Sequence, residues 1–356
     1  MASAPLRNLF PRIISFSNLL AAARMAQKGK RYRADVLAFN ARLEANLFQL
    51  QQELLAFTYE PGPYRRFHIR DPKPRIISAA PYRDRVVHHA LCAVIGPPLE
   101  RHFLATSYAN RLGYGSHRAL RKFARSCREH RWVLQIDIRL YFPSIDHQIL
   151  MAQLRRKINC PGTLWLLERI LANGAEVGPA IDSFPGDSLL TPLERPRGLP
   201  IGNLTSQYLA NLHLNDFDHA VRSLAGICAY LRYVDDGALF ADHPEHLERA
   251  KLRIEQELAA LRLRLHPVKT QIRRTLDGAS FVGFHVVRGV IRLRNHSLLR
   301  GRRRLKSHAQ GVSAGRVSSE QARASLQSWN AHLAHGHTHN LRRRLFQGLS
   351  FAPELN

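Results

Sequence analysis

The chain contains 356 residues, of which 53 are Lys or Arg and 27 are Asp or Glu, so its formal net charge at pH 7 is +26. Hydrophobic residues make up 45% of the sequence, enough for the cores of about two or three domains, which argues against a disordered basic tail. Basic residues occur along the whole length and favour a polyanionic partner. Nucleic acid is favoured over a membrane surface because no apolar run approaches the ~18 residues of a spanning helix.

The four cysteines, Cys92, Cys127, Cys160 and Cys228, stand singly without a CxxC pair. This spacing argues against both a zinc site and a disulfide framework, and it favours a reducing compartment. No acidic residue precedes Asp35, a composition shared with organellar transit peptides, although the basic turn at the end of this stretch also suits phosphate contact.

Hydrophobic periodicity predicts an α+β chain in which short strands alternate with helices. We expect two helices within 17–58, further helical ranges at 84–104, 116–129, 147–173, 203–224 and 244–263, and helices in the arginine-rich C-terminal part. We expect a hairpin at 65–77, strands at 132–138, 227–234, 237–240 and 268–275, and then an apolar segment at 281–284.

Three aspartates interrupt apolar strands, where burial of an unpaired carboxylate is costly. Asp137 ends the strand at 132–138, and Asp235 and Asp236 form the tip of the hairpin at 227–240. Two divalent cations about 3.5–4 Å apart can activate an attacking hydroxyl and stabilise the leaving oxygen of a phosphoryl transfer, and carboxylates are the ligands that Mg²⁺ prefers. Each position alone is better explained by a polar turn or a strand-end cap than by a metal site. Their combination in so basic a chain favours a metal site.

The residues around these aspartates resemble those of reverse transcriptases. Tyr233 to Asp236 resembles the YxDD box, residues 137–146 resemble the first catalytic box, and the 98-residue separation of Asp137 and Asp235 is typical of the family's palm domain. Three further segments resemble the third box (197–207), the fourth box (265–270) and the fifth box (281–284), and all the boxes stand in the family's order along the chain. The boxes are called motifs below. The chain is therefore identified as a member of this family, which implies a right-hand polymerase fold with fingers, a palm containing an antiparallel sheet, and a helical thumb.

The third box indicates which type of reverse transcriptase the chain resembles. Group II intron enzymes mostly carry a third box that ends in Ser-Pro, whereas Gly202 to Gln207 has the GxxxSQ form typical of reverse transcriptases from diversity-generating retroelements. The same type of enzyme is resembled by segments 84–91, 107–111, 328–329 and 338–341. The length of the chain agrees as well, because we expect no room for a maturase, endonuclease, RNase H or integrase domain. This resemblance implies cDNA synthesis that is error-prone at template adenines. A retron-like or antiphage reverse transcriptase is one alternative, and a non-catalytic RNA-binding scaffold is the alternative from another class.

The resemblance also implies a role for each candidate residue. Asp137, Asp235 and Asp236, assisted by the backbone carbonyl of Ile138, would hold two Mg²⁺ ions, for which Mn²⁺ can substitute, and Lys269 would protonate the leaving pyrophosphate. The residues expected at the incoming nucleotide are Lys73, Arg75, Phe142 as a steric gate against the ribose 2′-hydroxyl, Gly202, Ser206 and Gln207. The residues expected at the primer and template are Tyr233, Phe281, Gly283, Phe284, Arg302, Arg303 and Arg304.

For several of these residues a structural interpretation competes with the functional one. Phe142 would suit an ordinary core aromatic, and Lys73, Arg75, Lys269 and the late arginines would suit solvated surface charges. Six histidines lack cysteine or carboxylate partners in metal-site order, so we interpret them as packing or RNA contacts: His88, His89, His332, His335, His337 and His339.

By the same resemblance, an N-terminal extension and the fingers occupy 1–130, the palm 131–288 with an insertion near 161–196, and the thumb 289–356. The implied partners are a template RNA, an RNA/DNA hybrid, dNTPs and a small basic accessory variability protein that forms an oligomer. We expect no membrane partner and a cytoplasmic location in a bacterial, archaeal or phage system.

Overall fold

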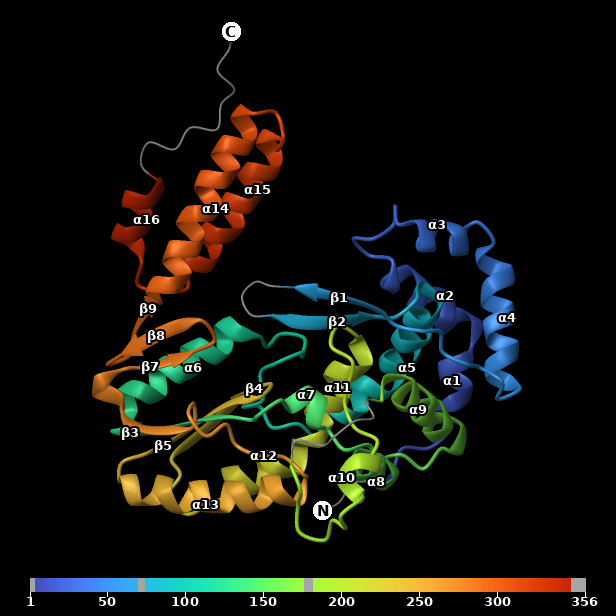
Figure 1. Cartoon of the computed structure of the whole chain (residues 1–356), viewed down its shortest axis with the longest axis horizontal. Coiled ribbons are helices and arrows are strands. Elements are labelled where there is room, and N and C mark those ends of the chain that lie inside the picture. Colours follow the sequence, from blue (N-terminus) through green and yellow to red (C-terminus); the bar gives the residue numbers. More distant parts are fainter. Residues whose placement is uncertain (1–3, 70–73, 176–181, 347–356) are drawn as a thin grey trace. The chain divides into compact units, whose positions relative to one another are not determined.

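The structure, a computed structural model, describes residues 4–69, 74–175 and 182–346. It has the predicted mixture of helices and antiparallel strand pairs (Figure 1). The chain divides into two compact units, each assembled from segments that are separate in the sequence. Unit 1 comprises Met1–Arg111, Asp137–Ser223 and Leu252–Pro267, and unit 2 comprises Leu112–Ile136, Leu224–Lys251 and Val268–Asn356.

Unit 1 is mainly helical and is organised around α5 (Tyr82–Glu100), which contacts α1, α2, α3 and α11. The helices of unit 1 besides α5 are α1 (Phe10–Ile14), α2 (Phe16–Ala26), α3 (Ala34–Asn40), α4 (Leu43–Leu55), α7 (Tyr141–Ser144), α8 (His147–Lys157), α9 (Pro161–Gly174), α10 (Thr191–Glu194), α11 (Leu204–His213) and α12 (Asn215–Arg222). Asn18 Nδ2 donates to Ala90 O at 3.1 Å and thereby ties α2 to α5. The N-cap of α2 is Ser15, whose side chain accepts from the Asn18 backbone.

The hairpin of unit 1 consists of β1 (Arg65–Ile69) and β2 (Arg75–Ala79), as predicted. The strands are antiparallel, with Arg65 opposite Ala79 and Ile69 opposite Arg75. Most of β1 is exposed, and the only buried residue of the pair is Ser78. The hairpin therefore presents a largely solvent-facing basic surface.

Unit 2 contains a four-stranded sheet in the order β4-β5-β3-β6 and a three-stranded sheet in the order β7-β8-β9. The strands are β3 (Trp132–Asp137), β4 (Ala229–Tyr233), β5 (Asp236–Ala241), β6 (Gln271–Arg274), β7 (Ala279–Phe281), β8 (Phe284–Val287) and β9 (Val290–Leu293). Helix α6 (Ser116–Glu129) contacts both sheets through an apolar face of helical period, which includes Leu120 and Phe123. The Phe123 ring meets Phe240 of β5 and stacks on Phe281 of β7. One aromatic core thus joins the two sheets.

The remaining elements are mostly helical. They are α13 (Pro244–Ala260), whose residues divide between the two units, the 3-10 turn η1 (Thr275–Asp277), and the C-terminal helices α14 (Asn295–Ser313), α15 (Ser319–Leu333) and α16 (His339–Phe346). Ser318 caps α15 in a complete capping box with Gln321.

Four expectations about secondary structure were wrong in detail. The range 203–224 forms two helices, α11 and α12, which are separated at Leu214. Residues 17–58 form three helices and not two, because the chain leaves the helical conformation at Arg42 (φ −131°). The range 147–173 is interrupted where Ile158 pairs with Leu6 and Pro161 begins a new helix. The three-stranded sheet was missed because its strands have only three or four residues.

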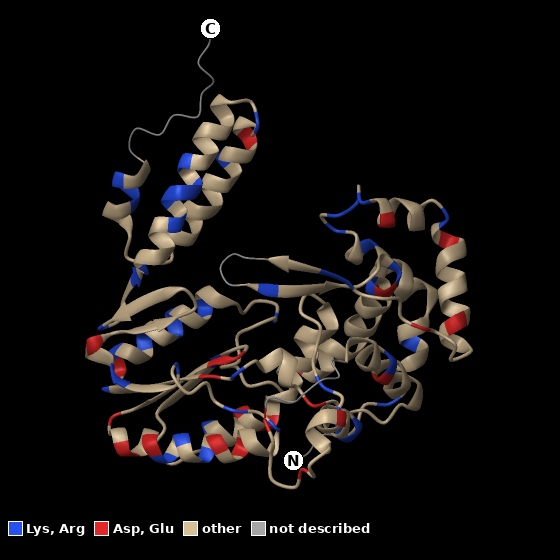
Figure 2. Ribbon diagram, in the orientation of Figure 1, with Lys and Arg blue, Asp and Glu red and all other residues tan. Residues whose placement is uncertain are grey.

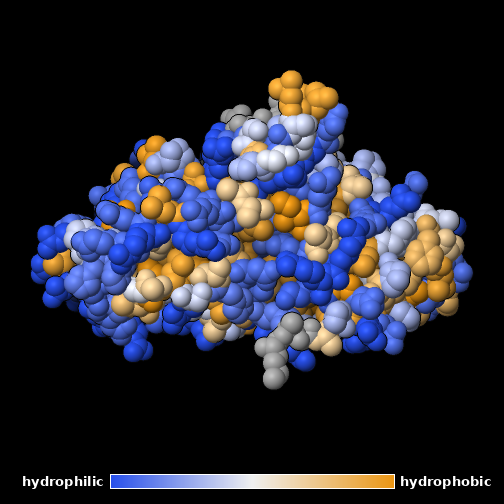
Figure 3. Space-filling model, turned by 90° about the horizontal axis from the view of Figure 1, so that it is seen from below, coloured by the Kyte–Doolittle hydropathy of each residue, from blue (hydrophilic) through white to orange (hydrophobic). Residues whose placement is uncertain are grey.

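The described surface carries many polar side chains. The face in Figure 3 is dominated by hydrophilic residues, with hydrophobic ones in separate small groups. Within the described ranges, no helix combines the length and apolar character needed to cross a membrane.

Candidate active site

The turn between β4 and β5 carries Asp235. Tyr233 pairs with Asp236, so Val234 and Asp235 form a two-residue turn. Val234 has a φ of 59°. A β-branched residue is strained in this region, and such strain persists mainly at functional sites, where the surrounding structure enforces it. The buried Arg232 donates from Nη1 to Val234 O at 2.8 Å and helps to hold the turn.

Asp137 is the last residue of β3, which neighbours β5 in the sheet. Gly237 of β5 lies against Ile136 of β3 so closely that a Cβ at 237 would be 2.7 Å from Ile136 Cγ1. Asp236 and Asp137 are the chain neighbours of these two residues. They therefore lie at the same end of the sheet as the turn with Asp235, and all three aspartates are partly buried. Three carboxylates provide only hard oxygen ligands, a donor set that fits Mg²⁺.

The chain that leaves β3 is bonded to the fourth motif. Asp137 O accepts from His266 N at 2.7 Å, and Ile138, which is buried, pairs with Leu265. Lys269 follows in the same motif and is exposed. The first and fourth motifs are therefore joined through the backbone.

The third motif is bonded to the first motif in the same way. Leu199 N donates to Phe142 O at 2.8 Å, and Gly198 N donates to Ile145 O at 2.8 Å. These bonds fix the position of the Phe142 backbone relative to the third motif.

Phe142 lies in α7 and is partly buried. The neighbouring Tyr141 is buried and donates from its hydroxyl to Ala210 O of α11 at 2.5 Å. The core position of this short helix is therefore filled by Tyr141. Phe142 is left at the less buried position, as a side chain that contacts a nucleotide would require.

The glycine of the third motif lies against the β1–β2 hairpin. Gly202 has a φ of +113°, and a Cβ there would be 2.9 Å from Ile77 Cγ2 of β2. Ser78 N donates to Ile201 O at 2.9 Å, and Asn203 Nδ2 donates to Ser78 O at 2.9 Å. A larger residue at 202 would therefore disturb both the turn and its contact with the hairpin.

The remaining nucleotide-site candidates lie on these same elements. Ser206 is buried and donates to Pro200 O at 2.8 Å, while Gln207, the next residue of α11, is partly exposed. Arg75 is exposed at the start of β2, and Lys73 falls outside the described residues. Phe142, Gly202, Ser206 and Arg75 are thus connected within unit 1 through the third motif and β2.

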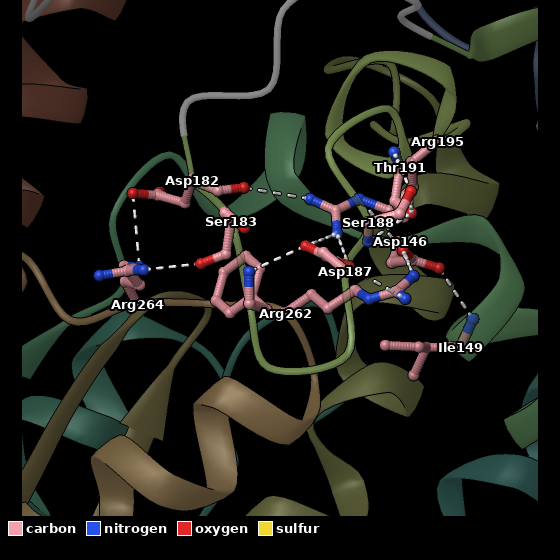
Figure 4. Close-up of polar contacts among 11 residues, drawn as sticks. Asp146, Ile149, Asp182, Ser183, Asp187, Ser188, Thr191, Arg195, Arg262 and Arg264 are labelled. Atoms are coloured by element: carbon pink, nitrogen blue, oxygen red, sulfur yellow. Dashed lines mark hydrogen bonds and ion pairs between the residues drawn. The ribbon is translucent and has the colours of Figure 1, made fainter.

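A buried charge network in unit 1 was not predicted (Figure 4). The side chains of Asp146 and Asp187 are fully buried. Arg262 reaches Asp146 at 2.7 Å and Asp187 at 3.3 Å, and Arg195 reaches them at 3.5 and 3.2 Å. Asp146 also caps α8 by accepting from Ile149 N at 3.0 Å. The network joins the end of the first motif, the chain before the third motif and the turn that follows α13.

The fifth motif forms the turn between β7 and β8. Val282 (φ 41°) and Gly283 (φ 89°) are two consecutive residues with positive φ, the pattern of a tight hairpin turn. The rings of Phe281 and Phe284 are buried, and Phe281 stacks on Phe123 at 4.8 Å. The exposed part of this motif is therefore the backbone of the turn at Gly283.

Helix α14 carries the late arginines (Figure 2). Arg302, Arg303 and Arg304 are exposed. Between them and Arg300, Gly301 lies against Trp329 of α15, where a Cβ would be 2.0 Å from the indole ring. The glycine allows close packing of the helix pair and leaves the adjacent arginines in solvent.

Several of the histidines serve packing. His117 stacks on His335 with ring centroids 3.4 Å apart, and His332 lies beside Phe284. His337 Nδ1 accepts from Ile291 N at 3.0 Å. The buried His88 has a pKa lowered to about 3, chiefly by burial. These contacts agree with packing, one of the two roles expected for the histidines.

Comparison with known proteins adds three findings. The family described as reverse transcriptase (RNA-dependent DNA polymerase) matches residues 69–286. Protein YkfC of Escherichia coli K12 is 30% identical over 289 residues, which cover 70% of this chain and 73% of that protein. The group II intron-encoded protein LtrA of Lactococcus lactis is 26% identical over 184 residues, 51% of this chain.

The extent of these matches differs. The alignment spans only 29% of LtrA and 25% of the putative COX1/OXI3 intron 1 protein of Saccharomyces cerevisiae, which is 22% identical over 62% of this chain. A solved structure, described as a partial Cas6-RT-Cas1–Cas2 complex, aligns with 71% of this chain and 41% of that chain, at 22% identity and a TM-score of 0.40. The family match and the similarity to YkfC thus cover most of this chain.

Proposed function

Because this chain belongs to the reverse transcriptase (RNA-dependent DNA polymerase) family, we propose that it copies a template RNA of its own retroelement into cDNA with errors concentrated at template adenines. RNA-directed DNA synthesis follows from the family. The restriction to a diversity-generating element is supported by one observation, the segment Gly202 to Gln207, whose GxxxSQ pattern lies at the turn against β2.

We propose the right-hand layout for the domains. The fingers and an N-terminal extension would occupy residues 1–130, the palm 131–288 with its insertion near 161–196, and the thumb 289–356. The four-stranded sheet with three aspartates at one end supports the palm, and the helix pair α14 and α15 with exposed arginines supports the thumb.

In the proposed active site, Asp137, Asp235 and Asp236 hold two Mg²⁺ ions, with Mn²⁺ as a substitute. When bound, such ions activate the primer hydroxyl and stabilise the charge on the transferring phosphate. The partly buried carboxylates are suited to this role, because they are costly to ionise unless cations are near. Lys269, exposed three residues after the His266 contact, would donate a proton to the leaving pyrophosphate.

The incoming dNTP is proposed to lie along the third motif. Arg75, together with Lys73, which lies outside the described residues, would bind the triphosphate, and Phe142 would exclude a ribose 2′-hydroxyl by its bulk. Gly202 would permit close approach of the template or nucleotide, and Ser206 and Gln207 would lie beneath the templating base. The backbone bond from Leu199 N to Phe142 O supports a fixed position of Phe142 beside the third motif.

The primer and template are proposed to contact unit 2. Tyr233 and the turn of Phe281, Gly283 and Phe284 would position the primer end. Arg302, Arg303 and Arg304 would follow a duplex backbone, where phosphate contacts and shape determine binding. The partners proposed from this function are the template RNA, its hybrid with cDNA, and a small basic accessory variability protein, in a cytoplasmic setting.

The experiment that tests this function is primer extension on an RNA template with Mg²⁺ and dNTPs, followed by sequencing of the products. We expect extension with errors concentrated at template adenines, with and without the accessory protein if the locus encodes one. Accurate extension would favour a retron-like or antiphage enzyme. The absence of extension in every setting would favour an RNA-binding scaffold.

A pair of variants tests the third motif separately. Q207A should change the error rate at adenines more than at other bases, because Gln207 would lie beneath the template base. Q256A replaces an exposed glutamine of α13 and should leave the error spectrum unchanged. Equal spectra for both variants would remove Gln207 from the proposed site.

A further inference from the structure

We propose that His130, Cys228 and Asp242 form a Zn²⁺ site at the end of the four-stranded sheet opposite the aspartate turn. Each residue offers one ligand atom, and the three atoms all lie within 4.8 Å of one another. Imidazole nitrogen, thiolate sulfur and carboxylate oxygen are the ligands that Zn²⁺ binds in proteins. This proposal does not depend on the proposed polymerase function.

The strands determine where these residues meet. Cys228 comes directly before β4, Asp242 comes directly after β5, and Cys228 N donates to Phe240 O at 2.9 Å. His130 lies two residues before β3. The six residues of β5 separate this end from Asp236 by about 20 Å. The cluster is therefore distinct from the proposed Mg²⁺ site.

The ring of His130 has an unsatisfied nitrogen that faces the cluster. His130 Nδ1 is inaccessible to solvent and has no hydrogen-bond partner among the described residues. It lies 3.7 Å from Asp242 Oδ1, which also accepts from Arg131 N at 3.2 Å. A buried nitrogen without a partner is costly, and a metal ion between it and the carboxylate would satisfy both. Asp242 can keep its bond to Arg131 and coordinate through its other oxygen.

Cys228 is chemically different from the other cysteines. It is exposed, whereas Cys92, Cys127 and Cys160 are buried. Burial raises the pKa of Cys127 to about 12, so that thiol is poorly suited to bind metal as a thiolate. The Cys228 thiol is therefore the accessible soft ligand, and its presence favours Zn²⁺ over Mg²⁺.

Gly226 lies beside the proposed site. The imidazole of His246 lies against Gly226, and the Cys228 sulfur lies 3.9 Å from Gly226 O. A zinc ion with three protein ligands commonly completes its tetrahedron with water. The site therefore has three protein ligands and one water.

The test uses the thiol of Cys228 in the full chain, stripped of metal under reducing conditions. We measure the alkylation rate of this exposed cysteine with and without Zn²⁺. At free zinc about 100 times the dissociation constant, alkylation should slow by about 100-fold, because only the metal-free thiol reacts. Mg²⁺ at the same concentration should not slow it. Equal rates with and without Zn²⁺ would overturn the proposal.

Variants distinguish this site from metal binding by the cysteine alone. H130Q and D242N should abolish the protection, and D277N, which changes an exposed acid of η1, should retain it. Protection that survives both ligand variants would also overturn the three-residue site. Co²⁺ gives a readout on the geometry, since a tetrahedral site with sulfur should produce the absorption bands of that geometry, and C228S should lose the sulfur band. Far-UV circular dichroism of each metal-free variant confirms that it is folded.

Discussion

The two ends of the four-stranded sheet carry different ligand sets on the same three strands. At one end Asp137, Asp235 and Asp236 offer only oxygen, and at the other end His130, Cys228 and Asp242 offer nitrogen, sulfur and oxygen. His130 and Cys228 are 98 residues apart in the sequence, as are Asp137 and Asp235. The equal separations follow from strands β3 and β4, which both lead from one end toward the other. Position along the strands therefore decides which residues meet, and side-chain chemistry decides which metal they suit.

The largest expected effect is a loss of cDNA synthesis, which should occur for a variant at one end of the four-stranded sheet and not for a variant at the other end. D235N should reduce cDNA synthesis by about 10³-fold or more, because a neutral amide is a much weaker ligand for Mg²⁺. D242N makes the same chemical change at the opposite end and should leave synthesis nearly unchanged. Primer extension measures both, and fluorescence anisotropy should detect unchanged RNA binding. Retained synthesis in D235N would contradict the active-site proposal.

The next largest effect is on the free energy of unfolding. It concerns Asp146, an aspartate whose charge is balanced by arginines of the protein. D146N should lower the free energy of unfolding by about 3–5 kcal/mol, because Arg195 and Arg262 would lose a buried counter-charge. The control is D216N, which removes an exposed partner of Arg156 and should cost only about 0–1 kcal/mol. Urea denaturation measures both. Equal losses would show that the buried network contributes no more than a surface ion pair.

A smaller effect concerns a buried histidine that, unlike His130, has a protein partner at Nδ1. His213 Nδ1 donates to Gln153 Oε1 at 2.8 Å, and burial lowers the pKa of His213 to about 4. The unfolded chain binds this proton near pH 6.5, so stability is complete above that pH and falls as pH decreases toward 4. Between pH 6.5 and 5 the loss from His213 should be about 2 kcal/mol.

This pH dependence is tested by denaturation at both pH values. H213Q should remove the loss attributed to His213, whereas H296Q, at an exposed position of α14, should preserve the wild-type pH dependence. An unchanged loss in H213Q would assign the acid sensitivity to other groups, such as His88.

The smallest expected effect is on the free energy of unfolding of variants in two turns, one at each end of the four-stranded sheet. V234G should raise the free energy of unfolding by about 1 kcal/mol, because glycine tolerates the φ of 59°, but it should slow primer extension. At the other end G226A should destabilise the chain by about 1–2 kcal/mol, since φ is +80° there and a Cβ would overlap His246. Thermal denaturation distinguishes the signs. A destabilised V234G would show that Val234 is not strained.

Much of the fold could be predicted where local patterns are strong. Both ends of the helix at 116–129 were predicted correctly, because apolar and basic residues recur along it with a clear helical period. The breaks at Arg42 and Ile158 could not be predicted, because Ile158 leaves the helix to pair with Leu6, more than 150 residues away. The strands β7 to β9 are too short for their alternation to be distinguished from a loop.

The candidate site divides in the same way. Asp137, Asp235 and Asp236 could be predicted as candidates because each interrupts an apolar strand within a contiguous motif. The sequence analysis missed Asp187, Arg195 and the cluster around Cys228. Their partners come from distant segments, so no short-range pattern in the sequence indicates these contacts. Single cysteines had argued against zinc, and the proposed zinc site uses only one.

The division of the chain into two interleaved units has a consequence for synthesis on the ribosome. The chain passes between the units five times, and the last segment of unit 1 ends at Pro267. Neither unit can be completed from the N-terminal part alone, so nascent chains shorter than this length expose unpaired apolar surface. We expect truncations between residues 112 and 267 to aggregate or to depend on chaperones, and the first complete unit to form only after three quarters of the chain has been translated.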